Sequence, residues 1–158
     1  MKTVIEALKK IQKMEPIVYG GKGDFEKLTI EFQPGIDSSE IEKWLPAGFT
    51  LPEDYVTLLN FSNGIAFFEY ACKFYPFKQA VKMGLDKWME EDYLCIAWYY
   101  EDAIYLKCDG SSRNIFVSEE GFSELRPMNM SLCAFLDASL CSGFSYFWLW
   151  GTDDYDLY

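Results

Sequence analysis

Hydrophobic residues recur along this chain at two spacings, and the two spacings predict different elements. In four segments the apolar positions repeat every three or four residues, which is typical of amphipathic helices. Asp37 and Ser131 precede two of these segments as N-caps. Pro52 suits the first helical position of a third, with Thr50 as its upstream cap. The helices are therefore expected over residues 3–14, 38–45, 52–62 and 131–141.

Other segments alternate with a period of two or are apolar throughout, and these predict strands. Residues 27–32 alternate and end at a Pro-Gly pair, which predicts one strand and a turn. The run 94–100 is apolar on both faces, as a central strand is. The Asp-Gly-Ser-Ser sequence at 109–112 predicts the turn of an antiparallel hairpin. Shorter strands are expected over 67–75, 114–118 and, at an edge, 122–126, and the hairpin should bury Ile104, Leu106, and Ile115 or Val117.

These elements together predict an α+β fold with a mixed, mainly antiparallel sheet packed by helices. The chain has 158 residues and is 50% hydrophobic, which is enough to bury a core without metals or disulfides. It contains no internal repeat and no low-complexity linker. We therefore expect one domain over residues 1–158, with an aromatic and acidic tail at 144–158.

The composition argues against an enzyme. The chain has no histidine, so it lacks the side chain most often used for proton transfer and for binding zinc. Its five cysteines include no Cys-x-x-Cys pair, which leaves no built metal site. Neighbouring carboxylates such as Glu119 and Glu120 are usually a solvated face. We expect no catalytic residue, no metal and no cofactor.

The charge indicates a basic partner. The net charge is −11, and residues 108–158 hold eight acidic against two basic side chains. Such a surface repels nucleic acid and attracts basic proteins. The longest apolar runs are far too short to span a bilayer, and the first residues lack a signal core, so we expect no membrane contact and a cytoplasmic location.

Two segments combine large aromatics with acids, as binding surfaces often do. One is Trp98-Tyr99-Tyr100-Glu101-Asp102, and the other is the tail, with five large aromatics in residues 144–150. The tail aromatics either cover the core or contact a partner. The candidate partner-binding residues are Glu90, Glu91, Asp92, Trp98, Glu101, Asp102, Trp148, Trp150, Asp153, Asp154 and Asp156.

One segment resembles a known family. A helix ending at Trp44 is followed by Leu-Pro-x-x-Tyr, a Leu-Leu pair and Asn-Gly, and this order resembles the opening signature of the SUKH superfamily, which includes Smi/Knr-like cell-wall regulators and bacterial immunity proteins. The glycine-rich step that many relatives carry in the central hairpin is replaced here by residues 98–102. The signature residues, expected to be structural, are Trp44, Leu51, Pro52, Tyr55, Leu58, Leu59, Asn63 and Gly64.

The resemblance implies a protein-binding role. The leading hypothesis is an immunity protein that neutralises a basic, nuclease-type toxin encoded by a neighbouring gene. The alternative is a regulatory scaffold of cell-wall synthesis or signalling, which would engage several partners. A weaker alternative is a small-ligand or peptide pocket lined by Trp88, Trp98, Tyr99 and Tyr100.

Overall fold

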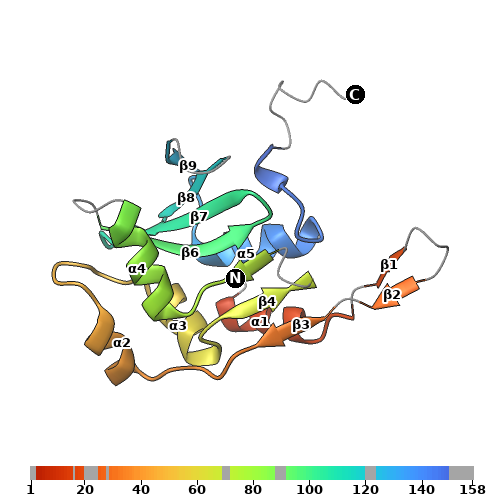
Figure 1. Cartoon of the computed structure of the whole chain (residues 1–158), viewed down its shortest axis with the longest axis horizontal. Coiled ribbons are helices and arrows are strands. Elements are labelled where there is room, and N and C mark those ends of the chain that lie inside the picture. Colours follow the sequence, from red (N-terminus) through yellow and green to blue (C-terminus); the bar gives the residue numbers. More distant parts are fainter. Residues whose placement is uncertain are drawn as a thin grey trace.

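A computed structural model describes residues 3–15, 17–19, 25–27, 29–68, 72–87, 92–119 and 124–149 (Figure 1). The helices in these residues are α1 (Val4–Gln12), α2 (Ser38–Trp44), α3 (Glu53–Phe61), α4 (Phe77–Lys87), α5 (Leu132–Cys141) and the 3-10 helix η2 (Phe147–Leu149). The strands are β1 (Ile17–Tyr19), β2 (Phe25–Lys27), β3 (Ile30–Phe32), β4 (Ile65–Phe67), β5 (Cys72–Phe74), β6 (Tyr93–Tyr99), β7 (Asp102–Lys107), β8 (Ile115–Ser118) and β9 (Arg126–Pro127). The predicted α+β class is confirmed.

Strands β3 to β9 form one antiparallel sheet, and their order in the sheet is their order in the chain. Strands β1 and β2 pair with each other in a separate two-stranded ribbon. β6 is the middle strand of the large sheet, as its apolar run predicts. The turn at 109–112 joins β7 to β8, and Ile104, Leu106, Ile115 and Val117 are all buried, so the predicted hairpin is confirmed.

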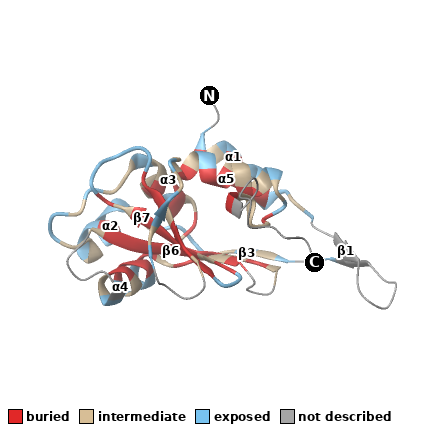
Figure 2. Cartoon of the chain, turned by 90° about the horizontal axis from the view of Figure 1, so that it is seen from above, coloured by how far each residue is buried: buried red, intermediate tan, exposed pale blue. Residues whose placement is uncertain are grey.

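Helices cover the large sheet unequally. Figure 2 shows α1 and α5 along one face of the sheet and α4 against part of the other. Leu94 and Ile96 of β6 belong to the larger core, which also contains the apolar faces of α1, α3 and α5. Tyr93 and Cys95 belong to a smaller core on the α4 side. β6 is therefore buried on both faces, whereas the β3 to β5 half of the sheet has a helical layer on one face only.

Hydrogen bonds confirm the predicted caps at Asp37 and Ser131, and they add a capping box at α1 that was not predicted from the sequence. Thr3 and Glu6 form a capping box at α1, and Asp37 accepts a hydrogen bond from the backbone N–H of Glu40 at α2. Ser131 accepts one from the backbone of Ala134 at α5. These side chains satisfy donors that the first turn of a helix leaves unpaired.

Two local predictions are wrong. Pro52 is the N-cap of α3, with no side-chain cap bond, and Thr50 instead donates its backbone N–H to the carbonyl oxygen of Cys108, at 2.8 Å. The alternating segment 27–32 is not one strand: β2 ends at Lys27, and β3 begins at Ile30 in the other sheet. Alternation predicts an extended backbone but not which neighbour it pairs with. Of the predicted edge strand 122–126, residues 122 and 123 lie outside the described ranges and residues 124 and 125 are not in a strand. The edge strand on this side of the sheet is β9, which begins at Arg126 and includes Pro127.

The signature segment connects α3 to the sheet and to α4. Tyr55, Leu58 and Leu59 lie in the larger core, as predicted. Past the helix end, the side-chain oxygen of Asn63 accepts a hydrogen bond from the backbone N–H of Phe77, at 2.7 Å, and so caps α4. Gly64 follows with a φ of 122°, which favours glycine. The signature residues thus have structural roles in this chain.

We predict that Leu59→Ala lowers the free energy of unfolding by about 2–5 kcal/mol, because Leu59 is fully buried and its truncation leaves a cavity. Val56→Ala on the same helix should cost less, since Val56 is only half-buried. Urea unfolding of the two variants measures both. Equal costs, or a cost below about 0.5 kcal/mol for Leu59→Ala, would show that α3 does not anchor the core.

Candidate functional site

The turn between β6 and β7 exposes an aromatic side chain. Tyr100 is 41% exposed. Among the described residues, no other large hydrophobic side chain is classed as exposed. Its φ of 53° lies in the left-handed region, which costs a non-glycine residue about 1–3 kcal/mol. Glu101, the next residue, is also exposed. The turn therefore presents an aromatic ring beside a carboxylate, in a conformation that neighbouring contacts must stabilise.

Tyr146 supplies part of that support from the end of the chain. Its ring centroid lies 5.2 Å from that of Tyr100. Its hydroxyl accepts a hydrogen bond from the backbone N–H of Glu101, at 3.4 Å. Such a bond is long, so the ring contact is the stronger of the two. Tyr100, Glu101 and Tyr146 together form what we call the turn site.

A buried hydrogen bond holds the support in place. The indole Nε1 of Trp148 donates to Oδ2 of Asp102 at 3.0 Å, and both residues are nearly inaccessible to solvent. The Trp148 ring also packs against Tyr99 and Tyr146, with centroids 5.6 and 5.5 Å away. Because a buried carboxylate needs a donor, this bond ties the C-terminal segment to the first residue of β7.

Cys72 lies under the turn site as a buried, protonated thiol. Burial raises the pKa of Cys72 to about 12, although a hydrogen bond with Tyr100 opposes the rise. Burial likewise raises the pKa of the Tyr100 and Tyr146 hydroxyls, and nearby ionisable groups add to the rise. A thiol or a phenol acts as a nucleophile in its deprotonated form. Because all three pKa values are raised, none of these groups is a nucleophile near neutral pH. The turn site is suited to contact and not to covalent chemistry.

The predicted partner-binding residues divide into four groups, one of which is the buried pair Asp102 and Trp148. Glu101 is exposed at the turn site. Asp92 and Trp98 are half-buried, and Trp98 lies on the α4 side of the sheet, paired across the strands with Lys73. The remaining residues outside the core lie beyond the described ranges, namely Glu90, Glu91, Trp150, Asp153, Asp154 and Asp156.

Asp102 and Trp148 correct the sequence interpretation. The sequence places both on an exposed surface, but the structure buries them against each other, at 5% and 7% exposure. Phe144 is also buried, with its ring centroid 4.5 Å from that of Phe67. For these described tail residues, cover of the core is therefore the right interpretation. Among residues 144–149, Tyr146 contacts the turn between β6 and β7.

The aromatic pocket suggested by the sequence does not form from Trp98 and Tyr99. Adjacent strand residues point to opposite faces, and Tyr99 is fully buried in the larger core while Trp98 packs with the smaller one. Trp88 lies outside the described residues. A sequence signal for the turn site does exist, because a turn between two apolar strands must expose the residues at its tip.

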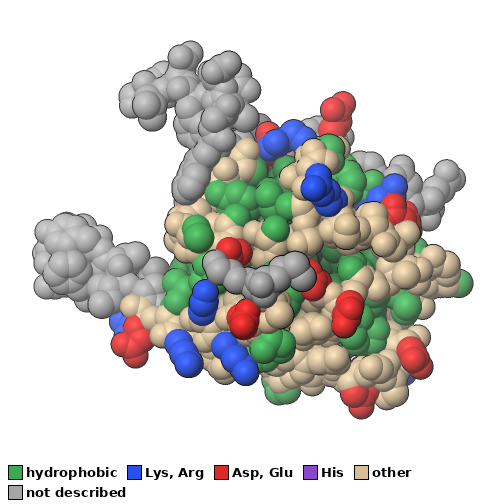
Figure 3. All heavy atoms as spheres, turned by 180° about the vertical axis from the view of Figure 1, so that it is seen from behind, with side chains coloured by type: hydrophobic (Ala, Val, Ile, Leu, Met, Phe, Trp, Pro, Cys, Tyr) green, Lys and Arg blue, Asp and Glu red, His purple; other side chains and the backbone are tan. Residues whose placement is uncertain are grey.

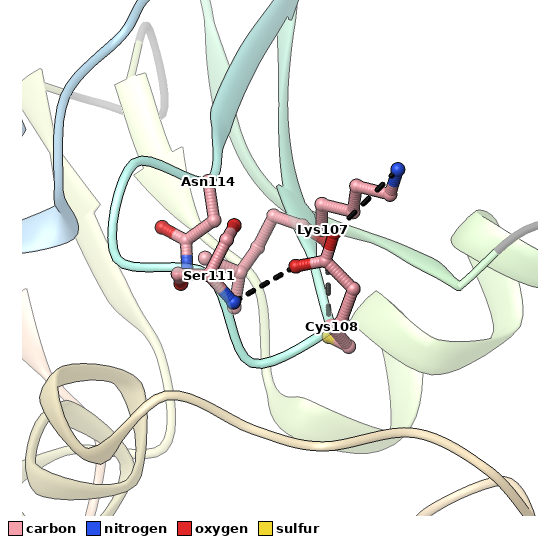
Figure 4. Close-up of polar contacts among 6 residues, drawn as sticks. Lys107, Cys108, Ser111 and Asn114 are labelled. Carbon is pink, nitrogen blue, oxygen red and sulfur yellow. Dashed lines mark hydrogen bonds and ion pairs between the residues drawn. The ribbon is translucent and has the colours of Figure 1, made fainter.

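The turn between β7 and β8 is a second polar cluster, and its contacts are internal (Figure 4). Asp109 accepts a hydrogen bond from the backbone N–H of Ser111 at 2.9 Å, and the Lys107 ammonium lies 3.6 Å from its other oxygen. The hydrogen bond from Ser111 lowers the pKa of Asp109. Asn114 donates to the carbonyl oxygen of Ser111. These contacts stabilise the hairpin, and the same turn lines a pocket of about 280 Å³ together with the start of α3 and with Ser131.

The described part of the chain contains neither a cluster of metal ligands nor a helix that could span a membrane. No group of three or more histidine, cysteine, aspartate or glutamate residues there could hold a metal ion. None of its helices has the length and apolar character needed to cross a bilayer. All five cysteines are free thiols, and Cys72, Cys95 and Cys108 are buried.

Comparison with known protein families finds no match for this sequence, and no curated protein matches it either.

We predict that Trp148→Phe lowers the free energy of unfolding by about 1–3 kcal/mol, because it removes a donor from a buried carboxylate. Trp44→Phe is the matched control. The Trp44 indole donates a hydrogen bond to the Glu40 carboxylate at 2.9 Å, but this bond lies at the surface. When the indole is removed there, water can donate to the carboxylate in its place. Thermal and urea unfolding should therefore show a clearly smaller cost for Trp44→Phe. Equal costs would mean that the Asp102–Trp148 bond does not anchor the tail.

Proposed function

We propose that this chain is a non-enzymatic protein-binding module that neutralises a basic protein toxin through the turn site. The observation that carries the proposal is Tyr100, an exposed aromatic held in a costly backbone conformation beside the exposed Glu101. Tyrosine is enriched among the residues that dominate binding energy at interfaces. A positive φ also occurs at Phe68, Asn129 and Phe144, so the exposure of the aromatic ring is what distinguishes Tyr100 from these residues.

The charge of the chain favours a basic partner. A net charge of −11 speeds the approach of a cationic protein by long-range attraction. Figure 3 shows basic and acidic side chains interspersed on the face seen from behind, so the acidic excess is not gathered there. The acids Asp153, Asp154 and Asp156 follow the turn-site support along the chain and add to the charge that a partner would meet.

The resemblance of the signature segment supports the same proposal. We infer membership of the SUKH superfamily, in its bacterial immunity branch, and a cytoplasmic location. In this chain Asn63 and Gly64 follow α3, Asn63 caps α4, and Gly64 has a positive φ, so the segment that carries the resemblance has a defined local structure. An immunity protein must be inherited with its toxin, so the partner should be the product of a neighbouring gene.

The test is co-expression of this chain with the basic product of the neighbouring reading frame. We predict restored growth, a one-to-one complex, and dissociation that is about tenfold faster or more in Tyr100→Ala, since a central aromatic contributes about 2 kcal/mol or more. Glu101→Lys should slow association and weaken its dependence on salt. Stopped-flow binding at several salt concentrations separates the two effects.

Glu42→Lys is the matched control for charge. It makes the same change in net charge on an exposed position of α2, away from the turn site in Figure 1. Its association rate should stay closer to that of the unaltered chain than the rate of Glu101→Lys. No protection and no complex, with both proteins folded, would reject the immunity role, and capture of several weak partners would favour the regulatory scaffold.

A further inference from the structure

The open half of the sheet contains a pocket that is separate from the turn site. It lies where β4 and β5 meet the start of α4, and its volume is about 250 Å³. That volume lies just below the usual range of about 300–1,000 Å³ for ligand pockets, so the pocket suits a small molecule. The residues on which its chemistry depends are Gln33, Ala66, Lys73, Tyr75, Pro76 and Gln79.

Strand alternation explains why this pocket is open. Ile65, Phe67, Cys72 and Phe74 point into the larger core, so Ala66 and Lys73 between them point to the opposite face. Figure 2 shows that α4 lies against only part of that face. On this face the side chains of Ala66 and Lys73 are therefore half-buried beside the first turn of α4.

Lys73 is the charged residue of the pocket lining. Its ammonium lies 5.0 Å from the centroid of the Tyr75 ring, and among the described residues it forms no ion pair. Its cross-strand neighbours are Ala66 and Trp98, neither of which is acidic. Glu31 lies one strand further, beyond Ala66, and does not line the pocket. Within the described ranges, Lys73 is thus a cation whose neighbours across the strands are not acidic.

Two amides add hydrogen-bond donors to the same space. Gln33 and Gln79 line the pocket and are exposed. The amide nitrogen of Gln79 contacts the sulfur of Met83 at 3.8 Å. A thioether sulfur is a weak acceptor, so a ligand oxygen could take its place. The positive end of the α4 dipole also favours an anion here. The polar side of the pocket thus offers one ammonium and two amides.

The rest of the lining is flat and apolar. The Tyr75 ring and Pro76 form one wall, and Gly64 leaves room beside Pro76, because a Cβ there would touch the proline ring at 3.4 Å. The φ of Gly64 also disfavours any side chain at this position. A flat apolar group can lie against this wall with its polar end at Lys73.

We propose that this pocket binds a small organic carboxylate with a flat apolar body. The carboxylate meets Lys73 and the amides of Gln33 and Gln79, and the body packs against Tyr75 and Pro76. A charge-assisted hydrogen bond to a carboxylate is stronger than one to a neutral oxygen, so the pocket selects the anion over its amide. The proposal does not depend on a toxin partner.

Titration of the isotopically labelled full chain by NMR tests the proposal, with benzoate as the probe and benzamide as its neutral counterpart. We expect benzoate to shift the backbone amide signals of Ala66, Lys73, Tyr75 and Gln79, and benzamide to bind at least about tenfold more weakly. Inorganic phosphate is the third probe, and it should bind more weakly than benzoate because it lacks an apolar body.

Two variants separate the pocket from general charge effects. Lys73→Gln should weaken benzoate binding by about tenfold or more, whereas Lys82→Gln, an exposed α4 position outside the lining, should change it less than about twofold. If Lys73→Gln does not fold, Gln79→Ala provides the same comparison. The proposal is overturned by absence of benzoate shifts, by equal binding of benzamide or phosphate, or by equal losses in the two lysine variants.

Discussion

Burial of β6 on both faces is the constraint on which the rest of the structure depends. A strand that is apolar on both sides needs cover above and below, so helices must pack on each face of the sheet. On one face α4 comes so close that a Cβ on Gly84 would lie 2.1 Å from the carbonyl oxygen of Tyr93. Glycine is therefore required where the helix crosses the strand. Because α4 sits on β6, the strands before it stay open on that side.

The two candidate sites follow from this arrangement. At one end of β6 the chain must turn sharply into β7, and the C-terminal segment packs under that turn through the Asp102–Trp148 bond. The core that this segment completes also supports Tyr100 at the surface. Near the start of α4 the uncovered strands leave the pocket around Lys73. Core packing thus positions both sites, and Tyr75, which lines the pocket, is itself a buried residue of the smaller core.

Much of the fold could be predicted because its signals are local. The caps at Asp37 and Ser131 and the turn at 109–112 depend on residues a few positions apart. The burial of Asp102 could not be predicted, because its donor is Trp148, 46 residues later, and an acid beside a turn is usually exposed. The predicted cap at Thr50 is wrong for the same reason, since the backbone N–H of Thr50 donates to the carbonyl oxygen of Cys108, which is distant in the sequence. The tip of the turn site, with Tyr100 and Glu101, carries a sequence signal, whereas the support from Tyr146 depends on packing 45 residues away.

The central claim is that the turn site, supported by the C-terminal segment, is the surface that meets a partner. Hydrogen exchange of the chain, alone and in complex with the basic product of the neighbouring reading frame, tests it most directly. The account predicts slower exchange of backbone amides at residues 99–102 and 144–149 in the complex, because partner contact stabilises the strained turn and its support together. Unchanged exchange at these residues, with slowing confined to α1 or to β3–β5, would contradict the account.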